Sequence, residues 1–163
     1  MAPPEPSPEA LELLRSASGL SLDEEVRFLH RGEPITHART LEVLHRSLER
    51  TPDGRYLVRI GRESAYVALA DAPYAVRGVA PDEGGRAPSL FLSDGGAERL
   101  DPATLRVGDD GVLRCRVKGG HEARFTRPAQ IQLGLALEED PQGSGRLFLR
   151  ADGRRWPVPG AEP

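Results

Sequence analysis

The stretch LERTPDGRYLVR, residues 48–59, returns later in the chain as LEEDPQGSGRLFLR, residues 137–150. Half of the positions agree once Ser144 and Gly145 are counted as two extra residues in the second copy. In each copy Leu-Glu precedes a turn that contains proline and glycine, and an apolar segment between two arginines follows that turn. Agreement of this kind within one chain indicates that a structural unit has been duplicated.

The residues before each copy predict the same order of elements in both places. A predicted hairpin comes first, turning at Gly32 before the first copy and at Gly119 before the second. Apolar residues at helical spacing then predict helices over residues 37–50 and 127–140, which reach into the two copies. Proline and glycine end both helices, and a strand follows each turn.

This pattern predicts an α+β protein of two similar small halves, each an antiparallel sheet with one main helix, packed against each other. Two copies are too few for a solenoid, which needs about three repeats or more. A seam between two such halves is a common place for a ligand pocket. The predicted parts are an N-terminal tail and short helix (1–20), a first half (21–82), a second half (88–158) and a C-terminal tail (159–163).

Two further local signals mark boundaries within this plan. Ser7 is the predicted N-cap of the short helix, and Thr36 is the predicted N-cap of the first main helix. The segment PDEGGRAP, residues 81–88, is charged, rich in glycine and bounded by prolines, which is typical of a linker.

Composition argues against several classes of protein. The formal charge is −3 and the pI about 5.8, without a block of basic residues, which argues against a general nucleic-acid binder. No apolar run approaches the roughly 20 residues that span a bilayer, and no secretory signal is present, so we expect no membrane association. The single cysteine, Cys115, argues against a disulfide framework. Together these features predict a cytoplasmic protein.

Sequence motifs for enzyme chemistry are missing. The chain has no Walker-type phosphate loop, no dinucleotide-binding glycine motif and no nucleophile elbow. Alternation over residues 113–118 predicts that Cys115 faces the core, where a thiol is a poor nucleophile. His37 and His45 lie about 12 Å apart along one predicted helix, so they cannot share a metal ion. We therefore expect no enzyme, no metal site and no cofactor.

Five residues are candidates for ligand binding. Asp71 can accept a hydrogen bond from a ligand and Tyr74 can stack on a base; the alternative is that Asp71 caps a bulge and Tyr74 packs in the core. Arg124 and Arg127 flank the start of the second main helix, where backbone N–H groups already favour anions. Arg59 closes the first copy of the repeat and can line the seam.

Four segments carry a resemblance to a known family, and they are FLHRGEPI, RTPDGRYLV, VALADAPY and KGGHEARFTR in that order. Over about residues 26–127 they resemble the bacterial domain-of-unknown-function family numbered 1285. The resemblance implies a duplicated α+β core whose second half is superficially similar to pleckstrin-homology folds. It also implies a small nucleotide-like ligand between the halves and a link to signalling. His121 departs from the family, which usually has an aliphatic residue there.

The leading hypothesis from the sequence is a non-catalytic ligand-binding or regulatory module that takes a nucleotide-like, anionic small molecule. The alternative is a protein–protein interaction module that uses an exposed sheet edge or an apolar patch and has no small-molecule ligand. The sequence leaves the oligomeric state and the identity of any ligand or protein partner open.

Overall fold

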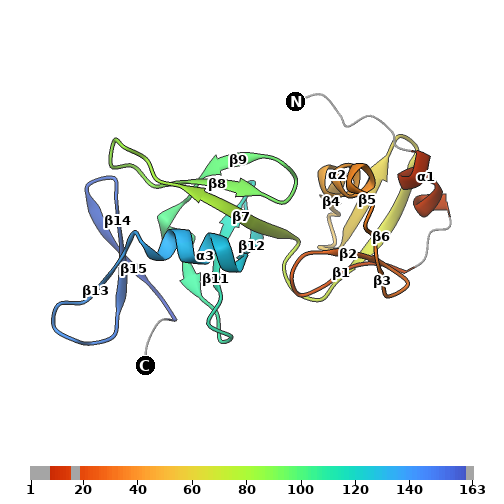
Figure 1. The fold of residues 1–163 in the computed structure, drawn as a ribbon. Helices are drawn as coiled ribbons and strands as arrows, with labels where there is room; N and C mark the ends of the chain where they lie inside the picture. Colours follow the sequence, from red (N-terminus) through yellow and green to blue (C-terminus); the bar gives the residue numbers. More distant parts are fainter. Residues whose placement is uncertain (1–7, 16–18, 161–163) are drawn as a thin grey trace. The chain divides into compact units, whose positions relative to one another are not determined.

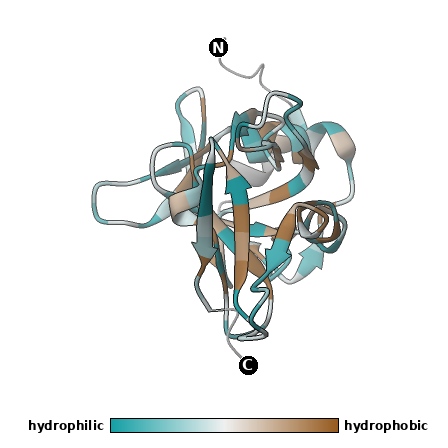
Figure 2. Cartoon of the chain, turned by 90° about the vertical axis from the view of Figure 1, so that its left-hand side faces the viewer, coloured by the Kyte–Doolittle hydropathy of each residue, from teal (hydrophilic) through white to brown (hydrophobic). Residues whose placement is uncertain are grey.

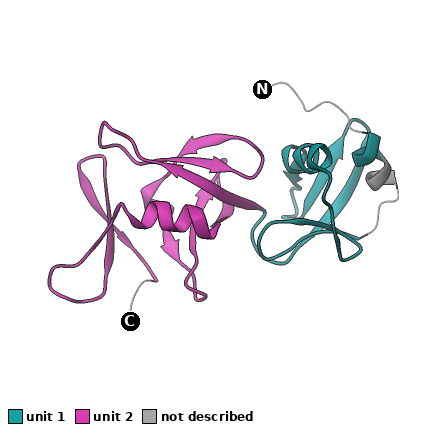
Figure 3. Ribbon diagram, viewed as in Figure 1, with its two compact units in different colours: residues 1–73 teal, residues 74–163 magenta. Residues whose placement is uncertain are grey.

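The structure is a computed structural model that describes residues 8–15 and 19–160. Ser7, the predicted N-cap of the first helix, lies outside the described residues. The chain divides into two compact units, residues 1–73 and residues 74–163, which Figure 3 shows in different colours.

Among its described residues, unit 1 contains one mixed six-stranded sheet and the helices α1 and α2 (Figure 1). The strand order is β3-β2-β1-β6-β5-β4; β1 runs parallel to β6, and the other neighbours are antiparallel. The elements are α1 (Pro8–Arg15), β1 (Leu20–Leu22), β2 (Phe28–His30), β3 (Glu33–Pro34), α2 (Ala38–Arg46), β4 (Leu48–Arg50), β5 (Tyr56–Ile60) and β6 (Glu63–Leu69).

Unit 2 contains a second mixed six-stranded sheet, one main helix and a separate three-stranded sheet. The large sheet has the order β10-β11-β12-β7-β8-β9, with β12 parallel to β7, and the small sheet has the order β13-β14-β15. The elements are β7 (Tyr74–Ala80), β8 (Ser89–Leu92), β9 (Ala97–Arg99), η1 (Pro102–Thr104), β10 (Arg106–Val107), β11 (Leu113–Val117), β12 (His121–Phe125), α3 (Arg127–Gly134), β13 (Leu137–Glu139), β14 (Leu147–Ala151) and β15 (Arg154–Val158).

The predicted duplication and the α+β class are confirmed. In each unit a hairpin leads into the helix, and a three-stranded meander follows it: β4-β5-β6 after α2, and β13-β14-β15 after α3. The register is the same, because Leu48 pairs with Val58 in unit 1 and Leu137 pairs with Leu149 in unit 2. Each half was predicted as an antiparallel sheet with one main helix, and the structure adds that each large sheet is mixed, because it contains one parallel pair.

Both main helices are shorter than predicted. In unit 1 His37, rather than Thr36, caps the N-terminus of α2. The helix ends at Arg46, and Leu48–Arg50 forms β4 because it pairs with residues 56–58. Pairing across the turn satisfies the backbone groups of this segment, and this tertiary contact outweighs helix propensity. In unit 2 the residues after α3 likewise form β13 rather than a longer helix.

The strand β7 belongs to unit 2, although the sequence placed it in a first half that ended at residue 82. It pairs in parallel with β12 and antiparallel with β8. The predicted linker, residues 81–88, therefore connects two neighbouring strands of one sheet. The boundary between the compact units lies between Pro73 and Tyr74 instead.

The core of unit 2 follows the alternation that the sequence predicted for β11. Leu113, Cys115 and Val117 are all at most 3% exposed, whereas the intervening arginines lie on the other face. Ala129 and Leu133 of α3 are also fully buried. Figure 2 shows hydrophobic and hydrophilic residues alternating along the strands. The prediction that Cys115 is a core residue is confirmed.

We expect Cys115 to be unreactive in the folded protein. Burial, aided by the charges of Glu98 and Glu122, raises the pKa of its thiol to about 12. A thiol-specific reagent at mildly alkaline pH should therefore label no cysteine in the native chain and one per chain in denaturant, because the sequence holds a single cysteine. Rapid labelling of the native protein would contradict the buried position.

Candidate functional site

A groove in unit 1 is the candidate binding site. Its volume is about 600 Å³, within the range of small-molecule pockets. The walls come from the start of β1, the turn before β5, the first residue of β5, and the second half of β6. The lining residues are Gly19, Leu20, Gly54, Arg55, Tyr56, Tyr66, Val67, Ala68 and Leu69.

Two structural features bring these segments together. The parallel pairing of β1 with β6 places Ser21 opposite Ala68, which brings the start of β1 beside the second half of β6. The Asp-Gly-Arg-Tyr motif at residues 53–56 supplies the opposite wall. Gly54 has a φ of 87°, a conformation that suits glycine, and it closes the tight turn between β4 and β5.

Arg55 and Tyr66 form a fixed, exposed pair in the groove. The guanidinium carbon of Arg55 lies 4.1 Å from the centre of the Tyr66 ring, and its Nη2 donates to the Tyr66 hydroxyl at 3.0 Å. Its Nε also donates to Asp53 at 2.9 Å. Tyr66 is 53% exposed. The pair therefore presents a planar guanidinium and a phenol ring side by side at the surface of the groove.

Asp53 keeps its negative charge at this site. A hydrogen bond from the Thr51 hydroxyl, followed by the one from Arg55, lowers the pKa of the Asp53 carboxyl. The carboxylate therefore orients Arg55 at all physiological pH values.

Two further arginines approach glycines that line the groove. Arg50 Nη2 is 3.8 Å from the place that a Cβ on Gly54 would take, and Arg31 Cγ is 2.9 Å from the equivalent place on Gly19. Within residues 8–15 and 19–160 neither Arg31 nor Arg50 makes an ion pair, whereas Arg55 has Asp53. Arg55 itself lines the groove, and a guanidinium in that position can pair with an anionic group.

Arg55 and Tyr66 are not among the five residues that the sequence singles out as candidates. The Pro/Gly turn that the sequence predicts here accounts for Gly54 but gives no role to Arg55. Alternation along β6 does carry the missing signal, since Ala65 and Val67 are buried and Tyr66 between them is exposed.

Arg59, Asp71 and Tyr74 do not line this groove. Arg59, on β5, pairs with Glu49 at 2.9 Å and is half exposed. Asp71 lies in the bend between β6 and β7 and is partly buried. Tyr74 is 3% exposed, and its ring packs edge-on against His121 with 5.5 Å between the ring centres. This position matches the core alternative for Tyr74 rather than base stacking.

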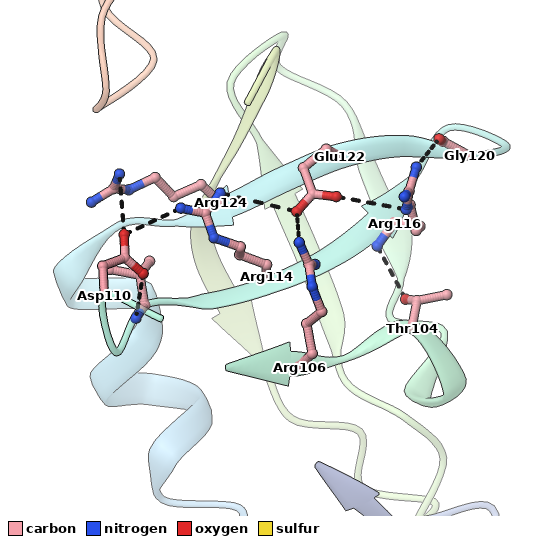
Figure 4. A network of polar contacts seen from close by, with 9 residues as sticks. Thr104, Arg106, Asp110, Arg114, Arg116, Gly120, Glu122 and Arg124 are labelled. Carbon is pink, nitrogen blue, oxygen red and sulfur yellow. Dashed lines mark hydrogen bonds and ion pairs between the residues drawn. The ribbon is translucent and has the colours of Figure 1, made fainter. Parts of the chain in front are cut away.

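Arg127 is the exposed first residue of α3, and Arg124 lies on β12 in a network of charges on the outer face of unit 2 (Figure 4). The network joins four arginines to two carboxylates. Its contacts are Arg106–Glu122 at 2.5 Å, Arg116–Glu122 at 3.6 Å, Arg114–Glu122 at 4.0 Å, Arg114–Asp110 at 3.2 Å and Arg124–Asp110 at 3.9 Å.

Glu122 is the centre of this network because three arginines share it (Figure 4). Asp110 contacts Arg114 and Arg124 at the other end of the network. The backbone N–H of Val112, together with Arg114 and Arg124, lowers the pKa of the Asp110 carboxyl. Arg124 is therefore engaged within unit 2.

Replacing Glu122 with Gln should destabilise unit 2 by about 1–2 kcal/mol, because like charges are left facing each other and partial exposure limits the loss. Denaturant unfolding of the full chain measures the change. The loss should shrink at high salt, which screens repulsion between the arginines. Glu83→Gln, in an exposed loop, is the control and should have almost no effect. A salt-independent loss would contradict the electrostatic explanation.

No three His, Cys, Asp or Glu side chains in the described part of the chain are grouped as metal ligands would be. No described helix is both long enough and apolar enough to cross a membrane.

The fold is similar to the folds of two proteins of known structure. No family model matches the chain, and no curated protein matches it. A DUF1285 family protein from Silicibacter pomeroyi DSS-3 superposes with a TM-score of 0.66 at 16% identity, over 94% of this chain and 87% of that one. A DUF1285 family protein from Shewanella baltica OS155 gives 0.58 at 14% identity, over 71% and 90%.

The chain has the fold of these DUF1285 family proteins. At such low identity the likeness extends to the fold alone. This likeness of fold agrees with the resemblance of the sequence motifs to the same family. Both structural neighbours are bacterial.

Proposed function

We propose that this protein is a non-catalytic ligand-binding module, and that the groove in unit 1 takes a small anionic molecule with a planar ring, such as a nucleotide. The observation that carries the proposal is the Arg55–Tyr66 pair beside a groove of about 600 Å³. The sequence placed the ligand between the halves, whereas this proposal rests on unit 1 alone.

The chemistry of the groove suits both parts of such a ligand. A planar ring can stack on Tyr66 or on the guanidinium of Arg55, and stacking of a base on an aromatic side chain contributes about 1–3 kcal/mol. Phosphate oxygens match the forked donors of arginine, which Arg55 supplies in the groove and Arg50, whose Nη2 lies near Gly54, can add. Leu20, Val67 and Leu69 give the remaining wall an apolar character, as in most small-molecule sites.

The lining residues favour binding over catalysis. They include no histidine, cysteine, serine or carboxylate, so the groove itself supplies no side chain of the usual nucleophile or general acid–base types apart from tyrosine. A regulatory role in signalling and a cytoplasmic location belong to this proposal through the family resemblance and the composition.

Thermal unfolding of the full chain with a panel of nucleotides, cyclic dinucleotides and inorganic phosphate tests the proposal. At a hundredfold excess over Kd, a specific ligand adds about 2.7 kcal/mol, which raises the unfolding midpoint by about 2–4 °C per kcal/mol. We expect a nucleotide to give a shift that inorganic phosphate does not, because the ring contributes part of the affinity.

Variants locate the site. Arg55→Ala and Tyr66→Leu should each abolish most of the shift, because they remove the charge and the stacking surface. Arg146 occupies the position of Arg55 in the second copy of the repeat and is exposed, so Arg146→Ala is the matched control and should keep the full shift. A flat panel on folded protein, or a shift that Arg55→Ala retains, would overturn the proposal.

A further inference from the structure

The turn before β5 carries charges at the rim of the groove. Its residues, 50–55, include Arg50, Asp53 and Arg55, so two positive charges and one negative charge give the turn a net charge of +1. Among the described residues that line the groove, Arg55 alone is charged. Nη2 of Arg50 lies 3.8 Å from the place of a Cβ on Gly54, which also lines the groove. An anionic group that binds Arg55 therefore also lies near Asp53 and Arg50.

Arg55 keeps donors for a ligand although two neighbours already hold it. Its Nε donates to Asp53 Oδ2 at 2.9 Å, and its Nη2 donates to the Tyr66 hydroxyl at 3.0 Å. A guanidinium has five N–H donors, and within residues 8–15 and 19–160 those on Nη1 have no hydrogen-bond partner. The end of the guanidinium can therefore bind two oxygens of one phosphate group side by side.

The Asp53 carboxylate limits how much negative charge such a ligand can bring. It is ionised, because hydrogen bonds from Thr51 and from Arg55 lower its pKa. Two exposed like charges about 6 Å apart repel each other enough to lower an affinity on the order of threefold. Arg50 offsets one negative charge, since it makes no ion pair within the described part of the chain. One phosphate charge is therefore balanced at this turn, whereas further charges are repelled.

The second copy of the repeat shows that the fold does not require these charges. The strand register equates Arg50 with Glu139, and both are the exposed last residues of their strands. Gln142 stands where the first copy has Asp53. The strands on either side of the second turn nevertheless pair in the same register as those of the first. The charges of the first turn are therefore free to serve a ligand.

We propose that the groove selects its ligand by charge, and that it takes a planar ring with a single phosphodiester charge, as in a cyclic mononucleotide. Such a ligand is preferred to a nucleoside, which has no phosphate for Arg55, and to a nucleoside triphosphate, whose added charges Asp53 repels. Asp53 is thus the residue that sets the upper limit of charge. The inference rests on the proposed ligand-binding function of the groove and adds the charge of the ligand to it.

Isothermal titration calorimetry of the full chain with adenosine, cyclic AMP and ATP, and with the corresponding guanine compounds, tests the charge preference. Divalent cations are left out, so that the triphosphate keeps its full charge. We expect the cyclic mononucleotide to bind about tenfold more tightly than the nucleoside, because a hydrogen-bonded ion pair with Arg55 forms. The triphosphate should bind no more tightly than the cyclic mononucleotide.

Asp53→Asn tests the role of the carboxylate. The amide oxygen can still accept the hydrogen bond from Thr51, so the turn should fold, and the thermal midpoint without ligand checks this. The variant should raise the affinity for the triphosphate relative to the cyclic mononucleotide, on the order of threefold for each added charge, and high salt should reduce this gain. Glu49→Gln is the matched control, because Glu49 is an exposed carboxylate that also pairs with an arginine Nε at 2.9 Å, that of Arg59. It should leave the ratio of the two affinities unchanged.

The outcomes separate this inference from the proposed function. If no nucleoside or nucleotide of either series binds the folded chain, the proposed function fails and the inference fails with it. If one of them binds, but the wild-type chain binds the triphosphate more tightly than the cyclic mononucleotide, the inference alone is overturned. It is also overturned if Asp53→Asn leaves the ratio of these two affinities unchanged.

Discussion

The pairing of one short strand with the strand across a Pro/Gly turn is the constraint on which both units depend. Leu48 opposite Val58, and Leu137 opposite Leu149, set the register of the meander that follows each main helix. The pairing ends the helix, because the backbone groups that would continue it are taken by the neighbouring strand. In unit 1 the same turn carries Gly54 and Arg55 to the rim of the groove, so the site inherits its geometry from this contact.

The features that the sequence predicted are those that local patterns encode. Duplication followed from the two similar phrases, and the burial of Cys115 followed from alternation along one strand. The ends of the helices could not be predicted in the same way, because Leu48 fits a helical stripe as well as a strand and only the pairing partner decides. The groove escaped prediction for a related reason: it needs the parallel contact of Ser21 with Ala68, between residues distant in the sequence.

The two units use one plan for different surfaces. In unit 1 the third strand of the meander, β6, pairs with β1 and so joins the meander to the rest of the large sheet. The groove lies at these strands, and the outer face of α2 is charged. In unit 2 the meander forms a sheet of its own, and the large sheet carries the arginine network around Glu122 on its outer face. Equivalent positions, such as Arg50 and Glu139, thus show which residues the fold requires and which were free to change.

The length of the turn between the paired strands has a consequence for how such a protein can evolve. The second copy holds two more residues there, Ser144 and Gly145, and its strands keep the same register. The number of residues in this turn can therefore change without a change in the register of the strands, since closing a slightly longer loop costs little free energy. A tip that varies without disturbing the core, and that in unit 1 also borders a groove, is a place where the shape of that groove can change while the scaffold stays constant.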